Sequence, residues 1–127
     1  MDAKILLVDD SSTSLLMEEM LFKQHTNYKV CMARDGEEAV AVALEQRPNL
    51  ILMDVVMPKM DGFAACREIR KHESLRDVPI IMVTSRGEPF NVETGFESGC
   101  NDYLTKPIDP AELLALVDSY LVSLGAN

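Results

Sequence analysis

Residues 50–54 of the chain read Leu50-Ile51-Leu52-Met53-Asp54, four apolar residues in a row followed by one acidic residue. Similar runs occur at Ile5-Leu6-Leu7-Val8, which precedes two aspartates, and at Ile80-Ile81-Met82-Val83, which precedes a threonine. A short apolar run without polar alternation is typical of a strand that is buried on both faces of a parallel sheet. The three stretches therefore predict the central strands of one parallel β-sheet.

Two further stretches predict the remaining strands. Tyr28-Lys29-Val30-Cys31-Met32 alternates polar and apolar residues more than the central runs do, which indicates a position nearer an edge of the sheet. Tyr103-Leu104-Thr105 predicts a weaker strand that ends at Lys106-Pro107. With the three apolar runs, these stretches give five strands.

Helical patterns separate the strands. Apolar residues recur at helical spacing in four segments, and we expect each set to form the face that packs against the sheet. The four sets are Leu16, Met17, Met20 and Leu21; Ala39, Val40, Ala43 and Leu44; Phe63, Cys66 and Ile69; and Leu113, Leu116, Val117, Tyr120, Leu121 and Leu124.

The last two helical segments differ in strength. The final helix is well marked, because Asp109 can serve as its N-cap and Pro110 suits the first helical position. The segment 86–99 contains Pro89, Gly95 and Gly99, and only Val92 and Phe96 mark an apolar face. It predicts a weak, mobile helix.

The alternation of strand and helix predicts an α/β fold. We expect a single doubly wound, five-stranded parallel sheet with right-handed crossovers and helices on both faces. The 127 residues correspond to one domain at ~150 residues per domain, so the predicted domain spans residues 1–127.

Composition excludes several classes of partner. The chain has 12 Lys and Arg against 21 Asp and Glu, a net charge of -9, which disfavours direct binding to nucleic acid or to anionic lipid. No apolar run approaches the about 20 residues that a membrane-spanning helix needs, and the first residues do not have the character of a signal peptide. We therefore expect a cytoplasmic protein.

Polar residues follow the apolar runs in a consistent way. Asp9, Asp10, Asp54, Thr84 and Lys106 all lie at or just beyond the carboxyl end of a predicted strand. Ligands of open α/β sheets bind outside the carboxyl ends of the strands. We expect these five side chains to form one site at this edge of the sheet.

The residue types indicate phosphoryl chemistry. Three neighbouring carboxylates repel one another, and an all-oxygen site that relieves this repulsion favours a hard cation, above all Mg²⁺. One carboxylate can then act as the nucleophile toward a phosphoryl group. Lys106 can meet the charge that spreads over the phosphoryl oxygens, and Thr84 can donate a hydrogen bond to them.

Four motifs stand at or near the predicted strand ends. They are Val8-Asp9-Asp10; Asp54-Val55-Val56-Met57-Pro58-Lys59-Met60-Asp61-Gly62; Val83-Thr84-Ser85; and Asp102-Tyr103-Leu104-Thr105-Lys106-Pro107. In this order and spacing, they closely resemble the receiver domain of two-component response regulators, in the CheY-like superfamily. The resemblance covers essentially the whole chain. It implies the flavodoxin-like strand order 2-1-3-4-5.

The resemblance also implies roles for individual residues. Asp54 would be the phosphoacceptor, and Asp10 and Asp54 would supply carboxylates to Mg²⁺. Asp9 would act partly through water, and the backbone carbonyl of Val56 would be the third protein ligand. Variation at Val56 and Arg86 would tune the lifetime of the phosphoryl group.

Further roles concern the switch. Thr84 and Lys106 would contact the phosphoryl group, and the family has a cis peptide bond at the position of Lys106-Pro107. Tyr103 matches the aromatic residue whose rotamer reports phosphorylation in this family. Thr84 and Tyr103 are therefore the expected switch residues.

The function that follows is a phosphorylation-controlled signalling switch. The expected phosphodonor is a histidine kinase or a histidine phosphotransfer protein, and the chain would catalyse only its own phosphorylation and dephosphorylation. Phosphorylation would change the surface formed by residues 86–124, to which a downstream target protein would bind. The chain would act alone, or it would be a receiver fragment of a longer response regulator or hybrid kinase.

The main alternative is an aspartyl-nucleophile phosphatase of the haloacid-dehalogenase type. Such an enzyme needs an Asp-x-Asp signature, because the second aspartate serves as the general acid, whereas this chain has Asp54-Val55-Val56. A nucleotide-binding domain is a weaker alternative, since neither G-x-x-x-x-G-K-[ST] nor G-x-G-x-x-G occurs.

Overall fold

The computed structural model of the chain describes residues 3–85 and 92–123. Strands alternate with helices along the chain, as the sequence predicts. The elements are β1 (Lys4–Val8), α1 (Ser12–His25), β2 (Lys29–Ala33), α2 (Gly36–Gln46), β3 (Leu50–Asp54), α3 (Gly62–Arg70), the short 3-10 turn η1 (Glu73–Leu75), β4 (Ile80–Thr84), α4 (Val92–Glu97), β5 (Asp102–Thr105) and α5 (Pro110–Ser123).

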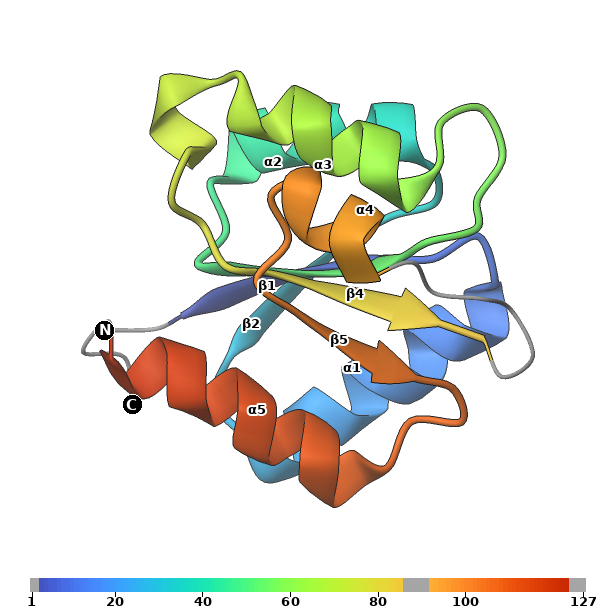
Figure 1. Ribbon diagram of the computed structural model, residues 1–127. Coiled ribbons are helices and arrows are strands. Elements are labelled where there is room, and N and C mark those ends of the chain that lie inside the picture. The colour runs from blue at the N-terminus through green and yellow to red at the C-terminus, as the bar shows by residue number, and fades with distance from the viewer. Residues whose placement is uncertain (1–2, 86–91, 124–127) are drawn as a thin grey trace.

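The five strands form one parallel sheet in the order β2-β1-β3-β4-β5. This confirms the predicted fold class and the strand order that the family resemblance implied. In Figure 1, α1 and α5 cover one face of the sheet, and α2, α3 and α4 cover the other. All strands end at the same edge, because all run in the same direction.

Each face of the sheet has its own apolar core. Along β1, Leu6 and Val8 pack with α2 and α3, while Ile5 and Leu7 pack with α1 and α5. The β3 and β4 residues are buried throughout, as continuous apolar runs predict. β2 has an exposed or half-buried residue at four of its five positions, which agrees with its place at the edge.

The predicted inner face of α1 is wrong. Leu15, Glu18 and Phe22 are the buried residues of this helix, whereas Leu16 and Met17 are 55% and 66% exposed. The reason is that a charged residue occupies the middle of the true inner face and interrupts its apolar pattern. Of the four apolar residues that the sequence analysis placed inward, Leu16, Met17 and Met20 lie toward solvent, and only Leu21 packs partly against the core.

The N-cap that the sequence predicts for the final helix is confirmed. The side chain of Asp109 accepts a hydrogen bond from the Ala111 backbone N–H at 3.0 Å, at the start of α5. α4 is short, six residues from Val92 to Glu97. The first part of the predicted 86–99 helix (residues 86–91) and Leu124 lie outside the described residues.

Candidate functional site

All five predicted site residues lie at the carboxyl edge of the sheet. Asp9 and Asp10 follow β1, Asp54 is the last residue of β3, Thr84 is the last residue of β4, and Lys106 follows β5. Because β1, β3 and β4 are neighbours in the sheet, residues far apart in sequence are brought to one place.

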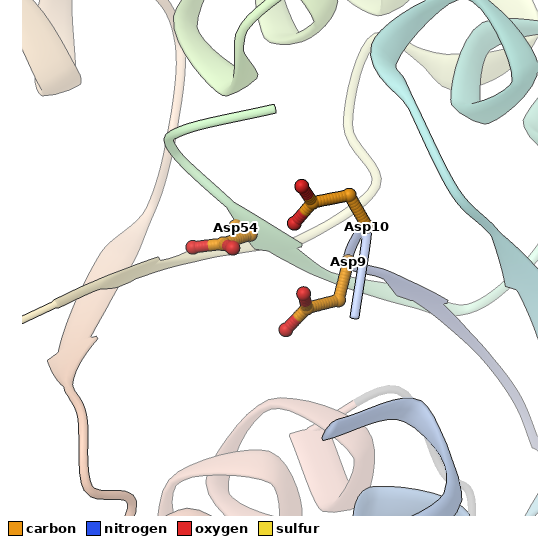
Figure 2. Close-up of side chains that lie close together, drawn as sticks. All are labelled: Asp9, Asp10 and Asp54. Carbon is orange, nitrogen blue, oxygen red and sulfur yellow. The ribbon is translucent and has the colours of Figure 1, made fainter. Parts of the chain in front are cut away.

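Three carboxyl groups converge at the ends of β1 and β3. One ligand atom from each of Asp9, Asp10 and Asp54 lies within 4.8 Å of the other two (Figure 2). Asp9 and Asp54 are buried, whereas Asp10 is exposed. The cluster therefore forms an acidic site that opens to solvent on the side of Asp10.

Lys106 is the basic residue that pairs with this cluster. Its ammonium lies 2.8 Å from Asp9 Oδ2 and 3.5 Å from Asp54 Oδ2. Burial opposes the charged form of Lys106, but the hydrogen bond to Asp9 and the charge of Asp54 outweigh it, so the pKa of Lys106 is raised. Among the described residues, one positive charge thus faces three carboxyl groups.

The environment of Asp54 disfavours its charged form. Burial raises the pKa of Asp54 to about 6, and the charges of Asp9 and Asp10 act in the same direction. The ammonium of Lys106 opposes this shift and does not cancel it. A cation placed among these carboxyl groups would remove the repulsion and favour the ionised, nucleophilic form.

Local backbone interactions hold the acidic residues in place. Asp9 Oδ1 accepts a hydrogen bond from the Ser11 backbone N–H at 2.9 Å, and the Ser11 side chain caps α1. At β3, the Gly62 N–H donates to the Val55 carbonyl at 2.8 Å. A Cβ on Gly62 would lie 2.5 Å from the Asp54 carbonyl oxygen, so glycine is needed for this close approach.

The remaining predicted residues lie around the same edge. The Thr84 side chain is buried, and its carbonyl accepts a hydrogen bond from the Lys106 N–H at 2.6 Å. Tyr103 is 39% exposed, and the Val56 side chain is exposed beyond β3. The Lys106–Pro107 peptide bond is cis, as the resemblance implied. Arg86 lies outside the described residues.

The sequence analysis missed one acidic residue of this region. Glu18 on α1 is only 9% exposed, and burial together with the charge of Asp9 raises its pKa to about 7. Its charge in turn acts on Lys106 and helps to raise the lysine pKa. The sequence did contain a signal for the burial of Glu18: at helical spacing it lies on the same face of α1 as Leu15 and Phe22, which are buried.

The donor set fits a hard divalent cation. The three side chains offer carboxylate oxygens only, within 4.8 Å of one another, and Mg²⁺ is held in proteins by a few carboxylates together with water. The exposure of Asp10 leaves room for that water. The histidine and cysteine ligands that zinc prefers are not part of the cluster.

The comparisons with known proteins agree on one family. Residues 5–118 match the family described as response regulator receiver domain. A probable transcriptional regulator, ycf27, of Cyanophora paradoxa is 44% identical over 119 residues, which cover 93% of this chain and 48% of that protein. The chain thus spans about half the length of this curated relative.

Two solved structures with the same fold come from two-component signalling proteins. The receiver domain of the sensor histidine kinase PA1611 from Pseudomonas aeruginosa is 38% identical with a TM-score of 0.85, over 94% of this chain and 98% of that one. Its crystal structure has a magnesium ion coordinated in the active site cleft. The chemotaxis response regulator CheY4 of Vibrio cholerae is 34% identical with a TM-score of 0.87, over 95% and 100% of the two chains.

Within residues 3–85 and 92–123, no helix combines the length and the apolar character that crossing a bilayer requires.

Proposed function

The chain belongs to the response regulator receiver domain family, and from this premise we propose that Asp54 accepts a phosphoryl group in a Mg²⁺-dependent reaction. Receiver domains are the phosphoryl-accepting switches of two-component systems, where they work with histidine kinases and downstream effectors. The proposal assigns that role to residues 1–127 as one domain. It also places the protein in the cytoplasm, where the phosphodonor would be a histidine kinase or histidine phosphotransfer protein.

One observation carries the proposal. The Asp54 carboxyl group, buried at the end of β3, lies beside two other carboxyl groups and 3.5 Å from the Lys106 ammonium. This is the arrangement that phosphoryl transfer to a carboxylate requires: a nucleophile, oxygen ligands for a cation, and a positive side chain for the phosphoryl oxygens.

We assign the metal ligands as follows. Asp10 and Asp54 supply carboxylate oxygens, Val56 supplies its backbone carbonyl, and Asp9 acts partly through water. The bound Mg²⁺ would neutralise carboxylate charge and draw off negative charge from the phosphoryl oxygens. The burial of Asp9 and Asp54 strengthens such interactions, because the local dielectric is low.

The chain's own residues perform the transfer. A carboxylate oxygen of Asp54 forms a bond to phosphorus while the phosphorus–nitrogen bond of the phosphohistidine breaks. The electron pair of the broken bond stays on the imidazole nitrogen. Lys106 donates hydrogen bonds to the phosphoryl oxygens, as does the Thr84 hydroxyl. Water later attacks phosphorus, which releases phosphate and restores the Asp54 carboxylate. The chain catalyses only these two reactions on itself.

The switch follows from the new charge. Thr84 turns toward the phosphoryl group, and Tyr103, which is 39% exposed in this structure, turns inward. These movements change the surface formed by residues 86–124, which then binds a downstream target protein. The described part of that surface comprises α4, β5 and α5.

Intact-mass spectrometry tests the proposal. The chain is incubated with acetyl phosphate, with Mg²⁺ or with EDTA, as wild type and as Asp54→Ala. We expect a single phosphate adduct on the wild type that needs Mg²⁺ and does not form on the variant. An adduct that persists on Asp54→Ala, or repeated turnover of unrelated phosphate esters, would contradict it and favour a phosphatase.

A further inference from the structure

The loop between β3 and α3, residues 55–61, carries the Val56 carbonyl that we assign to Mg²⁺. The carboxylate ligands have firmer supports, because Asp54 is the last residue of β3 and Asp10 closely follows β1. Val56 lies two residues beyond the strand, and its side chain is 54% exposed. The position of its carbonyl therefore depends on what holds the loop.

Hydrogen bonds fix the two ends of this loop. At its base, the Gly62 N–H donates to the Val55 carbonyl at 2.8 Å. Near its tip, the Met60 N–H donates to the Pro58 carbonyl at 2.7 Å, so the chain turns sharply at Lys59. Lys59 has a φ of 67°, a left-handed backbone that a residue with a side chain adopts only where surrounding contacts hold it.

The first turn of α2 provides such a contact. Gly36 is the first residue of this helix and is buried, and Met60 fills the space in which a side chain at position 36 would begin. A Cβ on Gly36 would lie 2.7 Å from the Met60 Cβ and 2.9 Å from the Met60 carbonyl carbon, and it would be closest to the Met60 carbonyl oxygen. Because two of these three atoms belong to the backbone, rotation of a side chain could not relieve the overlap. A side chain at position 36 would therefore push the loop away from α2.

A second contact joins the same two segments. Asp35 caps α2, since its Oδ1 accepts a hydrogen bond from the Glu38 N–H at 2.8 Å, and its Oδ2 lies 3.7 Å from the Lys59 ammonium. The lysine side chain is 64% exposed, so this ion pair contributes little by itself. The close packing of Gly36 against Met60 is the stronger determinant of where the loop lies.

Backbone freedom does not account for a glycine at this position. Among the described glycines, only Gly99 has a left-handed backbone, whereas Gly36 is part of a helix. Glycine is a poor helix former compared with alanine. The space that Met60 occupies is therefore the physical reason for Gly36.

We propose that Gly36 is a positioning residue for the metal site: because it has no side chain, Met60 packs against α2 and holds the Val56 carbonyl where it can bind Mg²⁺. The inference rests on the proposed function, since it concerns the ligand that Val56 supplies. It makes the metal site depend on α2, a helix that supplies none of the assigned ligands.

Isothermal titration calorimetry with Mg²⁺ tests the proposal on the full chain. We expect Gly36→Ala to weaken Mg²⁺ binding by about tenfold, the scale on which supporting residues affect metal affinity. The matched control is Ala41→Gly, at an exposed position of the same helix. It weakens α2 through helix propensity without adding an atom near the loop, and it should bind Mg²⁺ as the wild type does.

NMR of the Val56 carbonyl carbon, observed through the Met57 amide, separates positioning from general destabilisation. Saturating Mg²⁺ should shift this carbon in the wild type and in Ala41→Gly. In Gly36→Ala the shift should be lost, while the side-chain carboxyl carbons of Asp10 and Asp54 still respond to the metal.

Met60→Ala tests the same contact from the other side and serves if Gly36→Ala does not fold. It keeps the backbone but removes most of a side chain that packs against the core, so Mg²⁺ binding should weaken in the same direction. If both single variants fold, their effects on Mg²⁺ affinity should not add in the double variant, because both act through one contact.

Wild-type Mg²⁺ affinity in Gly36→Ala, or in Met60→Ala if only that variant folds, would overturn the proposal. An equal loss of affinity in Ala41→Gly would also overturn it, because helix stability would then be the cause. A parallel acetyl phosphate reaction separates this inference from the proposed function. If the wild type binds Mg²⁺ and is phosphorylated on Asp54 while Gly36→Ala binds the metal equally well, only the role of Gly36 fails. If the wild type is not phosphorylated, the proposed function itself fails.

Discussion

The Lys106 ammonium lies 3.5 Å from Asp54 Oδ2, although two strands, two α-helices, a short 3-10 turn and their loops separate the two residues in the chain. The same ammonium is closer to Asp9, at 2.8 Å. Lys106 therefore offsets negative charge on two buried carboxylates. A phosphoryl group on Asp54 would offer the ammonium a stronger hydrogen-bond acceptor at almost the same place.

Lys106→Met is expected to slow phosphorylation of Asp54 by acetyl phosphate by at least about tenfold, because the phosphoryl oxygens lose a charged donor in a site of low dielectric. The rate is measured by mass spectrometry at saturating Mg²⁺. Lys71→Met, which removes an exposed lysine paired with Glu68, is the matched control and should leave the rate unchanged. A Lys106→Met rate equal to wild type would show that the lysine does not act on the phosphoryl group.

The metal-free protein is expected to lose stability as pH rises from about 4 to about 6. Burial raises the pKa of Asp54 from 3.8 to about 6, so in this window the folded state binds more protons than the unfolded state. Ionising this group in the folded protein costs about 3 kcal/mol. Glu18, whose pKa is raised to about 7, contributes in the same direction over an overlapping window.

Asp54→Asn tests this pH dependence. At pH 7.5 in EDTA the variant should have the higher free energy of unfolding by urea, by about 1–3 kcal/mol, and the difference should vanish near pH 4. Mg²⁺ should stabilise the wild type and have less effect on the variant. A wild type that becomes more stable between pH 4 and 6 in EDTA would contradict the environment described for Asp54.

Gly62→Ala is expected to weaken Mg²⁺ binding severalfold, because the added Cβ would lie 2.5 Å from the Asp54 carbonyl oxygen and would displace the loop after β3. Isothermal titration calorimetry measures the affinity. Ala64→Gly in the same helical turn is the control: it lowers stability by about 1 kcal/mol through helix propensity, without adding an atom near Asp54. Unchanged affinity in Gly62→Ala would show that the loop tolerates the methyl group.

Arg70→Met is expected to lower the free energy of unfolding by about 2–4 kcal/mol. The guanidinium donates to the Gly99 carbonyl at 2.8 and 3.1 Å and to the Leu75 carbonyl at 2.9 Å, and so ties α3 to the turn before β5. Arg67→Met, an exposed arginine on the same helix, is the control and should change stability by less than about 0.5 kcal/mol. Equal effects of the two substitutions would contradict the role of Arg70.

The sequence predicted the sheet well because its strands carry an unambiguous pattern. In β3 and β4 every position before the last is apolar, and in β1 every position after Lys4 is apolar, a pattern typical of strands that are buried on both faces. The polar residues that follow could be placed at one edge by topology alone, without any knowledge of side-chain geometry.

The inner face of α1 was not predictable in the same way. Apolar residues occupy both sides of this helix, and the buried face contains Glu18, so periodicity favoured the wrong set. The burial of Glu18 depends on the position of Lys106 and of the loop after β5, which only the folded structure brings to α1. The burial of this acidic side chain is for this reason a feature of the tertiary structure.

Chemical localisation of the phosphoryl group tests the central claim most directly. The wild type is treated with acetyl phosphate and Mg²⁺ and then with borohydride, which reduces an aspartyl phosphate to homoserine, and its peptides are sequenced by tandem mass spectrometry. The account predicts homoserine at position 54 alone, and none in a reaction with EDTA. Homoserine at position 9 or 10, or a phosphoryl group retained on a serine or histidine, would contradict it.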